Sequence, residues 1–244
     1  ATLDRQAADY YTRYQQGIEE YAAECAMVKV FCSEAAARAI DEMLQVHGGY
    51  GYIVGHPIEQ LYRDERVQRI YEGTNEINRL LIPGLLMREG IGIQVSHRQS
   101  GDAATGDFAA EKRLLQGMKN ICLALSSMIV QRFGPKAAGE QEIMLALADA
   151  AIEIFALESA VLRAEKASAA ATDSRKALYR AVAMACAFRT RQHFAMATEK
   201  CAVCIGDDAM FASIGAAIDY NGAGLLVAKR LLADATSEAE RYIF

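Results

Sequence analysis

Apolar residues recur along most of the chain at steps of three and four, the spacing that places them on one face of an α-helix. The first such helix is predicted from about Gly17 or earlier to Val46. Its apolar stripe consists of Ala26, Val30, Ala37, Ile40 and Leu44. Gly48 and Gly49 then supply the left-handed backbone that ends helices. Because β-branched clusters with period-two alternation are nearly absent, the pattern predicts an all-α fold.

A second helix is predicted to begin after Thr74. At the N-cap, the Thr74 hydroxyl would accept a hydrogen bond from an amide near Ile77. The apolar face of this helix would consist of Ile77, Leu80, Leu81 and Leu85. Pro83 is expected to kink or end it, because proline has no N–H to donate. Between the two helices, residues 48–58 form a predicted loop and residues 59–70 one or two short charged helices.

The most polar and glycine-rich stretch of the chain, Glu89 to Asp107, is the predicted joint between two parts. Beyond it, helices are predicted near 108–133, 138–171, 173–204 and 209–233. The second of these has a broad apolar face made of Ile143, Met144, Leu147, Ala151, Ile154, Leu157 and Val161. Four long helices with short connections favour an antiparallel bundle. The predicted organisation is one helical part over residues 1–90, a linker over 91–107 and a second bundle over 108–244.

Composition narrows the class of protein. With 244 residues, 52% of them hydrophobic and 23% charged, the chain is neither disordered nor collagen-like. The net charge of −5 is spread over both parts, with 10 basic and 14 acidic residues up to position 100, so no basic patch for nucleic acid is expected. Six cysteines are too few for a disulfide scaffold and favour a reducing compartment. The first residues do not resemble a secretory signal, and no apolar run resembles a membrane span.

The glycine-rich run from His47 to Tyr52 resembles a phosphate-binding loop at first sight. A dinucleotide-binding loop, however, follows a strand and opens a helix, whereas this run follows a helix. Taken alone, it is more typical of a turn that ends a helix. Such a turn still presents Gln45 and exposed glycine backbone to a ligand.

Glu72 is the candidate for acid–base chemistry. It lies in a break between helices, with Tyr71 before it and Gly73 after it. A carboxylate buried in an aromatic-lined turn has a raised pKa and can act as a general base. On the residues alone, a solvated loop glutamate is favoured over a general base, and the general base stays open as the alternative.

Cysteine and basic residues offer weaker signals. Cys201 and Cys204 have the spacing of a redox or metal motif, but a second cysteine pair is lacking and a pair of buried thiols is favoured. We predict no metal site. The basic residues between Arg175 and Lys200 are more typical of a solvated helix face than of a membrane-surface contact.

Several motifs in one order carry a resemblance to a known family. They are Ala26-Met27-Val28-Lys29-Val30-Phe31, Gln45-Val46-His47-Gly48-Gly49-Tyr50-Gly51-Tyr52, Leu61-Tyr62-Arg63-Asp64 and Arg69-Ile70-Tyr71-Glu72-Gly73-Thr74-Asn75-Glu76-Ile77. Together they closely resemble the C-terminal helical domain of acyl-CoA dehydrogenases. The chain beyond residue 107 resembles, more weakly, the extra helical domain of the very-long-chain type. The resemblance implies an incomplete catalytic bundle over 1–90, followed by an appended bundle over 108–244.

The resemblance assigns chemistry to the turn. It implies that Glu72 removes the α-proton of an acyl-CoA while a hydride leaves the β-carbon for FAD, giving the trans-2-enoyl-CoA. It also implies that Tyr71 and Gly73 contact the substrate. The backbone amide of Glu72 would donate a hydrogen bond to the thioester carbonyl. The resemblance implies two groups of cofactor residues. Those at the FAD are Thr74, Asn75 and Glu76. Those at the ADP half of the FAD bound to a neighbouring subunit are Gln45, Val46, His47, Gly48 and Gly49.

Further expectations follow from the family. An oligomer, either a homodimer or a homotetramer, is implied, with an electron-transfer flavoprotein as electron acceptor in fatty-acid β-oxidation. The compartment would be a bacterial cytoplasm or the mitochondrial matrix. The N-terminal and β-domains of the family are not visible in this sequence, so the chain alone is expected to be inactive and not to retain FAD. The rival interpretation is a non-catalytic helical module for oligomerisation or for docking to a membrane surface.

Overall fold

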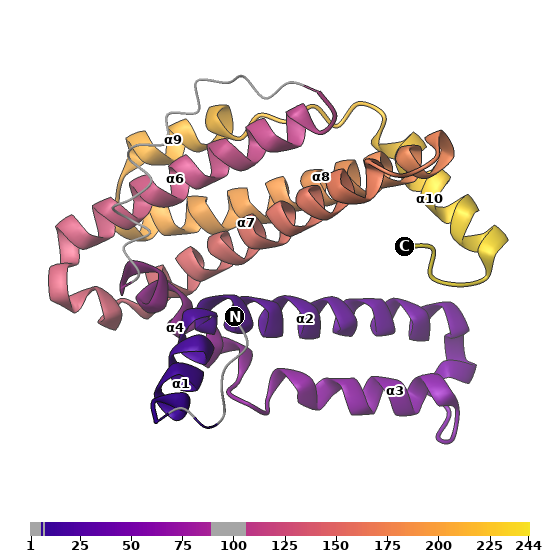
Figure 1. Cartoon of the computed structure of the whole chain (residues 1–244), viewed down its shortest axis with the longest axis horizontal. Coiled ribbons are helices and arrows are strands. Elements are labelled where there is room, and N and C mark those ends of the chain that lie inside the picture. Colours follow the sequence, from indigo (N-terminus) through magenta and orange to yellow (C-terminus); the bar gives the residue numbers. More distant parts are fainter. Residues whose placement is uncertain (1–5, 7, 89–105) are drawn as a thin grey trace. The chain divides into compact units, whose positions relative to one another are not determined.

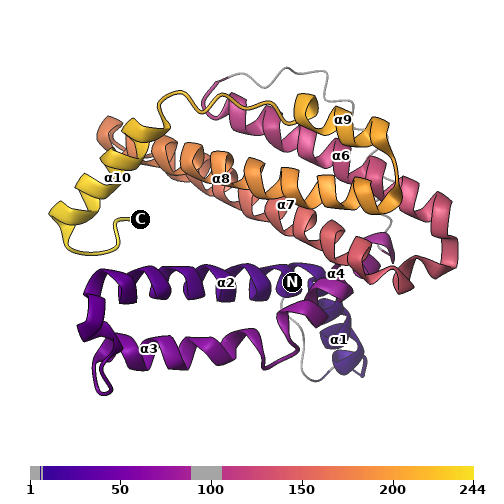
Figure 2. The same ribbon diagram turned by 180° about the vertical axis from the view of Figure 1, so that it is seen from behind.

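The computed structural model describes residues 6, 8–88 and 106–244. The chain divides into two compact units, unit 1 (Ala1–Gly90) and unit 2 (Ile91–Phe244). Within the described residues every long element is an α-helix and there is no strand, so the predicted all-α class is confirmed. Figures 1 and 2 show the helices of each unit from two opposite sides. The predicted linker lies almost wholly outside the described residues.

Unit 1 is built around one long helix. The helix predicted to end at Val46 is two helices, α1 (Tyr10–Glu20) and α2 (Ala22–His47), which meet at Tyr21. Helix α2 ends at Gly48, whose φ of 58° is left-handed, as predicted from the glycines. A 3₁₀ turn, η1 (Gly48–Tyr52), then leads to α3 (Pro57–Arg66), which runs back beside α2 (Figure 1).

The core of unit 1 lies at the N-terminal half of α2. The short helix η2 (Val67–Arg69) follows α3, and α4 (Asn75–Arg88) then packs against α2. Buried apolar side chains at this contact are Ala23, Ala26, Met27, Val30 and Ile82. The later residues of the predicted stripe, Ala37, Ile40 and Leu44, are only half-buried. Helix α3 also packs against α2. Pro83 was expected to kink or end the helix. It is buried and does not end α4, which continues for another turn to Arg88.

Unit 2 is a bundle of three long helices with two shorter ones. They are α6 (Ala109–Phe133), α7 (Gln141–Ser168) and α8 (Asp173–Ile205), with the 3₁₀ turn η4 (Gly134–Gly139) between the first two. The main contact is between α7 and α8, where small buried residues such as Ala150 and Ala187 let the helices approach closely. The predicted apolar face of α7 is buried except at the half-buried Ile154.

The prediction of one helix over residues 209–233 is wrong, because the structure has two helices in this region. Helix α9 (Asp208–Ala217) ends before a turn, and α10 (Leu225–Ala239) begins after it. The turn has its own polar contacts, since Tyr220 Oη donates to Glu111 Oε1 at 2.6 Å and the amide of Ala223 donates to Asn221 Oδ1. Gly224, with φ 92°, supplies the left-handed conformation.

A buried carboxylate joins α7 to α8. Glu153, only 6% exposed, receives two bonds from the Arg189 guanidinium at 3.0 and 3.1 Å and one from Thr190 Oγ1. His193 Nδ1 lies 3.4 Å from the same carboxylate. This paired charge fixes which faces of the two helices meet. The expectation of two buried thiols is only half right, because Cys201 is buried whereas Cys204 is exposed.

Candidate functional site

The turn before α4 has an unusual backbone. Glu72 has φ 54° and Gly73 has φ 77°, so two consecutive residues are left-handed. For a residue other than glycine this conformation costs about 1–2 kcal/mol and requires support from its surroundings. The side chains of Tyr71 and Glu72 are both exposed in this chain. The burial that was expected to surround the carboxylate is therefore not supplied by these residues.

Two side chains hold this turn from outside it. Asn78 Nδ2 lies 2.8 Å from the carbonyl oxygen of Gly73, 3.1 Å from that of Thr74 and 3.4 Å from that of Glu72. Lys29 Nζ, on α2, donates to the same Gly73 oxygen at 2.8 Å and to Asn75 Oδ1 at 2.7 Å. The Gly73 carbonyl thus accepts from both an ammonium and an amide. These bonds stabilise the left-handed pair.

The amide N–H groups of the turn have no acceptor. In the part of the chain that the structure describes, neither the N–H of Glu72 nor that of Gly73 donates a hydrogen bond. Carbonyl groups of the turn, in contrast, are bonded by Lys29 and Asn78. Donors without acceptors beside an exposed carboxylate are suited to a ligand that carries a carbonyl oxygen.

Helix α4 begins as the sequence predicts. The amide of Ile77 donates to Thr74 Oγ1 at 3.3 Å, which confirms Thr74 as a capping residue. The pKa of the Glu76 carboxyl is lowered, because it accepts hydrogen bonds from its own backbone N–H and from the Thr74 hydroxyl. Glu76 is exposed and is held in its ionised form in the first turn.

Asn75 is occupied by contacts within the chain. Its side chain is buried, and Nδ2 donates to Ser33 Oγ at 3.0 Å and to Glu34 Oε1 at 3.2 Å. Arg79 in turn forms two bonds with the Glu34 carboxylate, at 2.6 and 2.9 Å. Although burial raises the pKa of Glu34, the bonds and charge of Arg79 outweigh it and lower the pKa below its usual value. The network attaches the start of α4 to α2.

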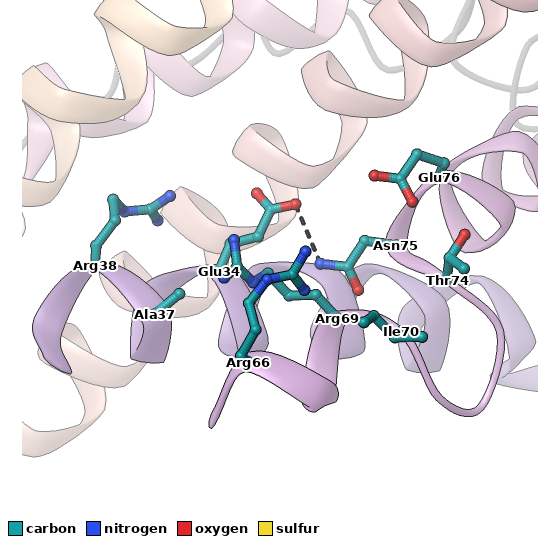
Figure 3. Close-up of a pocket in the computed structure, with 9 residues that line it drawn as sticks. All are labelled: Glu34, Ala37, Arg38, Arg66, Arg69, Ile70, Thr74, Asn75 and Glu76. Carbon is teal, nitrogen blue, oxygen red and sulfur yellow. Dashed lines mark hydrogen bonds between the residues drawn. The ribbon is translucent and has the colours of Figure 1, made fainter. Parts of the chain in front are cut away.

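A cavity of about 320 Å³ lies beside this network. Figure 3 shows Glu34 and Arg38 on α2 on one side, and Thr74, Asn75 and Glu76 at the start of α4 on the other. Its remaining lining residues are Ala37, Arg66, Arg69 and Ile70. The buried Nε of Arg69 has no hydrogen-bond partner among the described residues. Three guanidinium groups surround this cavity together with the carboxylates of Glu34, which Arg79 pairs, and Glu76. The excess of positive charge that favours an anionic ligand is therefore small.

The second group of predicted site residues forms the other end of α2. Gln45, Val46, Gly48 and Gly49 are exposed there, and a side chain added to either glycine would meet nothing within 4 Å. His47 is held, since its Nδ1 lies 2.8 Å from the carbonyl oxygen of Met43 and its ring packs edge-on against His56. The open glycine backbone leaves room for a ligand or a neighbouring chain.

The two groups do not form one site within the chain. Lys29, beside the Glu72 turn, and His47 are eighteen residues apart on one helix, which corresponds to about 27 Å. Thr74, Asn75 and Glu76 lie with Glu72 at the first end, and Gln45 to Gly49 lie at the second. One ligand can therefore contact both groups only if it is long, or if the two groups that it contacts come from different subunits.

Several residues of the site were not predicted. Lys29, Ser33 and Glu34 bond Asn75 across more than 40 residues of sequence, and no local spacing indicates this. The bond from Arg79 on α4 to Glu34 on α2 spans a similar separation. Asn78 could have been predicted from the sequence as a residue that holds the turn. Asparagine side chains often bond nearby backbone groups, and Asn78 lies four residues after the N-cap Thr74.

Comparison with known proteins gives the family. Two family models match the chain, one over residues 3–84 and the other over residues 117–209, and both are described as the acyl-CoA dehydrogenase C-terminal domain. The chain belongs to the acyl-CoA dehydrogenase family. Among the described residues no group of His, Cys, Asp and Glu is arranged to bind a metal ion.

Relatives in this family match both units. A probable acyl-CoA dehydrogenase of Bacillus subtilis is 37% identical over 168 residues, covering 64% of this chain and 28% of that protein. The very long-chain specific acyl-CoA dehydrogenase of Mus musculus is 29% identical over 184 residues, covering 62% of this chain and 28% of the relative. A Bacillus anthracis acyl-CoA dehydrogenase solved with FAD matches with a TM-score of 0.85 and 30% identity, over 93% of this chain and 41% of that one. The chain thus spans well under half the length of these acyl-CoA dehydrogenases.

Proposed function

We propose that this chain supplies the catalytic base and part of the FAD site of an acyl-CoA dehydrogenase. The observation that carries the proposal is the turn at Glu72, which combines an exposed carboxylate, a left-handed backbone and an amide N–H that has no acceptor within residues 6, 8–88 and 106–244. Glycine is required beside it, since Gly73 has φ 77° and a side chain there would approach Asn78 Nδ2 to 3.1 Å. Family membership gives this geometry its reaction.

The residues of this chain fit FAD. The cofactor carries a diphosphate, and the cavity beside the turn is lined by Arg38, Arg66 and Arg69, the last with a buried Nε that lacks a partner among the described residues. Of the two carboxylates that also line it, Glu34 is paired with Arg79. Thr74 and Glu76, which the family assigns to FAD, line the same cavity. Because all polar atoms of the Asn75 side chain are bonded within the chain, we assign Asn75 the part of holding α4 in place.

We infer the steps at this turn from the reaction of the family. The thioester carbonyl accepts a hydrogen bond from the Glu72 amide, which acidifies the α-carbon of the acyl chain. The Glu72 carboxylate then takes the α-proton and ends as the neutral acid. When bound, FAD accepts the hydride that leaves the β-carbon. The C–C bond of the saturated acyl-CoA becomes the double bond of trans-2-enoyl-CoA, so that one proton and one hydride leave the substrate.

Burial of Glu72 must come from outside the described residues. Tyr71 and Glu72 are exposed here, and a base in contact with water is less effective than one from which water is excluded. We therefore infer that this chain works together with a flavin-binding part and does not retain FAD by itself. The open loop at Gln45–Gly49, about 27 Å away along α2, would meet the ADP half of FAD on a neighbouring subunit, in a homodimer or homotetramer.

The wider role is proposed on the family alone. Electrons would pass to an electron-transfer flavoprotein in fatty-acid β-oxidation, in a bacterial cytoplasm or the mitochondrial matrix. None of the helices that the structure describes is long and apolar enough to cross a membrane.

Two preparations test the proposal. The full polypeptide encoded by the gene should contain about one FAD per chain and reduce a dye with saturated acyl-CoA, forming trans-2-enoyl-CoA. The 244-residue chain alone should show neither flavin absorbance nor turnover. If the full polypeptide forms no enoyl product with acyl-CoA of any chain length, the proposed activity is wrong. If the 244-residue chain holds FAD and turns over, the inferred need for a flavin-binding part is wrong.

A further inference from the structure

We propose that Lys29 and Asn78 are positioning residues that set the direction of the catalytic carboxylate. This inference rests on the proposed function, since it concerns the same turn. Among the described residues, the hydrogen bonds of these two side chains go to backbone carbonyls and to Asn75, and the one bond to Glu72 is to its carbonyl oxygen. Their effect on the reaction would thus pass through the conformation of the turn.

The bonds fix the peptide planes on the C-terminal side of Glu72. A peptide unit is planar and trans, so holding a carbonyl oxygen holds the whole plane. The two N–H groups of Asn78 bond the carbonyl oxygens of Gly73 and Thr74, and the Glu72 oxygen at 3.4 Å is a weaker, shared acceptor. Lys29 adds a charged donor to the Gly73 oxygen. With these planes fixed, Glu72 stays left-handed, and its Cα–Cβ bond keeps one direction.

The same bonds keep the turn open to a ligand. Carbonyl oxygens of the turn are occupied by Lys29 and Asn78, while the N–H groups of Glu72 and Gly73 stay without an acceptor among the described residues. If the carbonyls were released, Glu72 could leave the left-handed region, which is unfavourable for a residue with a side chain. Both the carboxylate and the amide donor would then move from the positions that the reaction needs.

Lys29 holds the turn against α2 through a second contact. Its ammonium bridges the Gly73 carbonyl and Asn75 Oδ1, so it ties the turn to the buried start of α4. Arginine can reach the same acceptors with a different geometry, whereas methionine of similar length cannot donate at all. The arginine variant is therefore the conservative test of a donor, and the methionine variant removes it.

The test uses the full polypeptide encoded by the gene, loaded with FAD. Lys29→Met and Asn78→Asp should lower kcat about 100-fold, the effect of a misplaced reacting group, and should slow exchange of the substrate α-hydrogen with D₂O similarly. FAD content should stay unchanged, KM should change less than kcat, and Lys29→Arg should recover much of the loss. Arg63→Met is the matched control, because it removes a cation whose side chain on α3 is 76% exposed, and it should leave kcat unchanged.

The outcomes separate this inference from the proposed function. Normal kcat and normal α-hydrogen exchange in both Lys29→Met and Asn78→Asp would overturn the positioning role. A loss of kcat that merely follows a loss of FAD would overturn it too. If Lys29→Met does not fold, Asn78→Asp, which keeps the size of the side chain, decides the matter by the same measurements. If Glu72→Gln is fully active, the proposed function fails instead, whatever the Lys29 variants do.

Discussion

The contact between α6 and α9 should not tolerate even one added methyl group. Gly117 on α6 faces the end of α9, and a Cβ at this position would lie 2.0 Å from the carbonyl oxygen of Ala217. Carbon and oxygen do not approach so closely, and a backbone carbonyl cannot rotate aside as a side chain can. In Gly117→Ala, therefore, α9 must move by about 1 Å or more.

The cost can be worked out from what α9 covers. Ile214 and Ile218 at this end are buried, and each contributes about 1.5–3 kcal/mol by its burial. Overpacking in a close contact costs about 1–3 kcal/mol. Alanine offsets about 1 kcal/mol of this by its higher helix propensity. Overpacking less the gain in propensity leaves about 0–2 kcal/mol. Partial exposure of Ile214 and Ile218 as α9 moves raises the expected loss of unfolding free energy to about 2–4 kcal/mol, which lowers Tm by about 5–15 °C.

Thermal and urea unfolding of the 244-residue chain, followed by circular dichroism, measures this loss. Gly215→Ala is the matched control, because Gly215 lies in α9 with nothing within 4 Å of an added Cβ. The control should be unchanged or more stable by up to about 1 kcal/mol. If Gly117→Ala is as stable as Gly215→Ala, the close contact between α6 and α9 is wrong.

Two further predictions concern the network at the start of α4. Asn75→Leu should cost about 2–4 kcal/mol of stability, because it removes hydrogen bonds to Ser33 and to the charged side chains of Lys29 and Glu34. Urea unfolding at pH 7 measures this loss, and an unchanged midpoint would contradict the prediction. The lowered pKa of Glu34 adds stability that is present above its usual pKa of 4.5 and is lost as pH falls through the lower folded value. Glu34→Gln should therefore flatten the loss of stability below pH 4.5, and an unchanged pH profile would show that Arg79 does not hold the carboxylate ionised.

The sequence predicts the helices better than the places where they break. Periodicity locates α2, α6, α7 and α8 because each has a long apolar face. It misses the break at Tyr21, where apolar and polar residues continue without a glycine or proline. Periodicity also predicts one helix where α9 and α10 are separate. The turn between them is held by a hydrogen bond from Tyr220 to Glu111, which is distant in the sequence.

The candidate site was predictable only in part. The resemblance indicates Glu72 and its neighbours, and Thr74 could be identified as a cap from its position alone. Sequence gives no indication that Asn75 is buried, since the residues that bond it, such as Ser33 and Lys29, lie on another helix. It also gives no indication that Glu72 is left-handed, which follows from the tertiary contacts that hold the turn.

The most direct measurement of the central claim is α-proton removal by Glu72. In the full polypeptide encoded by the gene, Glu72→Gln keeps the size of the side chain but cannot accept the proton at neutral pH. With FAD content equal to that of the wild type, the variant should lose at least about 1,000-fold in acyl-CoA oxidation and in α-hydrogen exchange with D₂O. Glu59→Gln, in the Arg63–Glu59 pair of α3, also keeps the size of the side chain and should keep both activities. Wild-type rates in Glu72→Gln would contradict the account, because the base would then lie elsewhere.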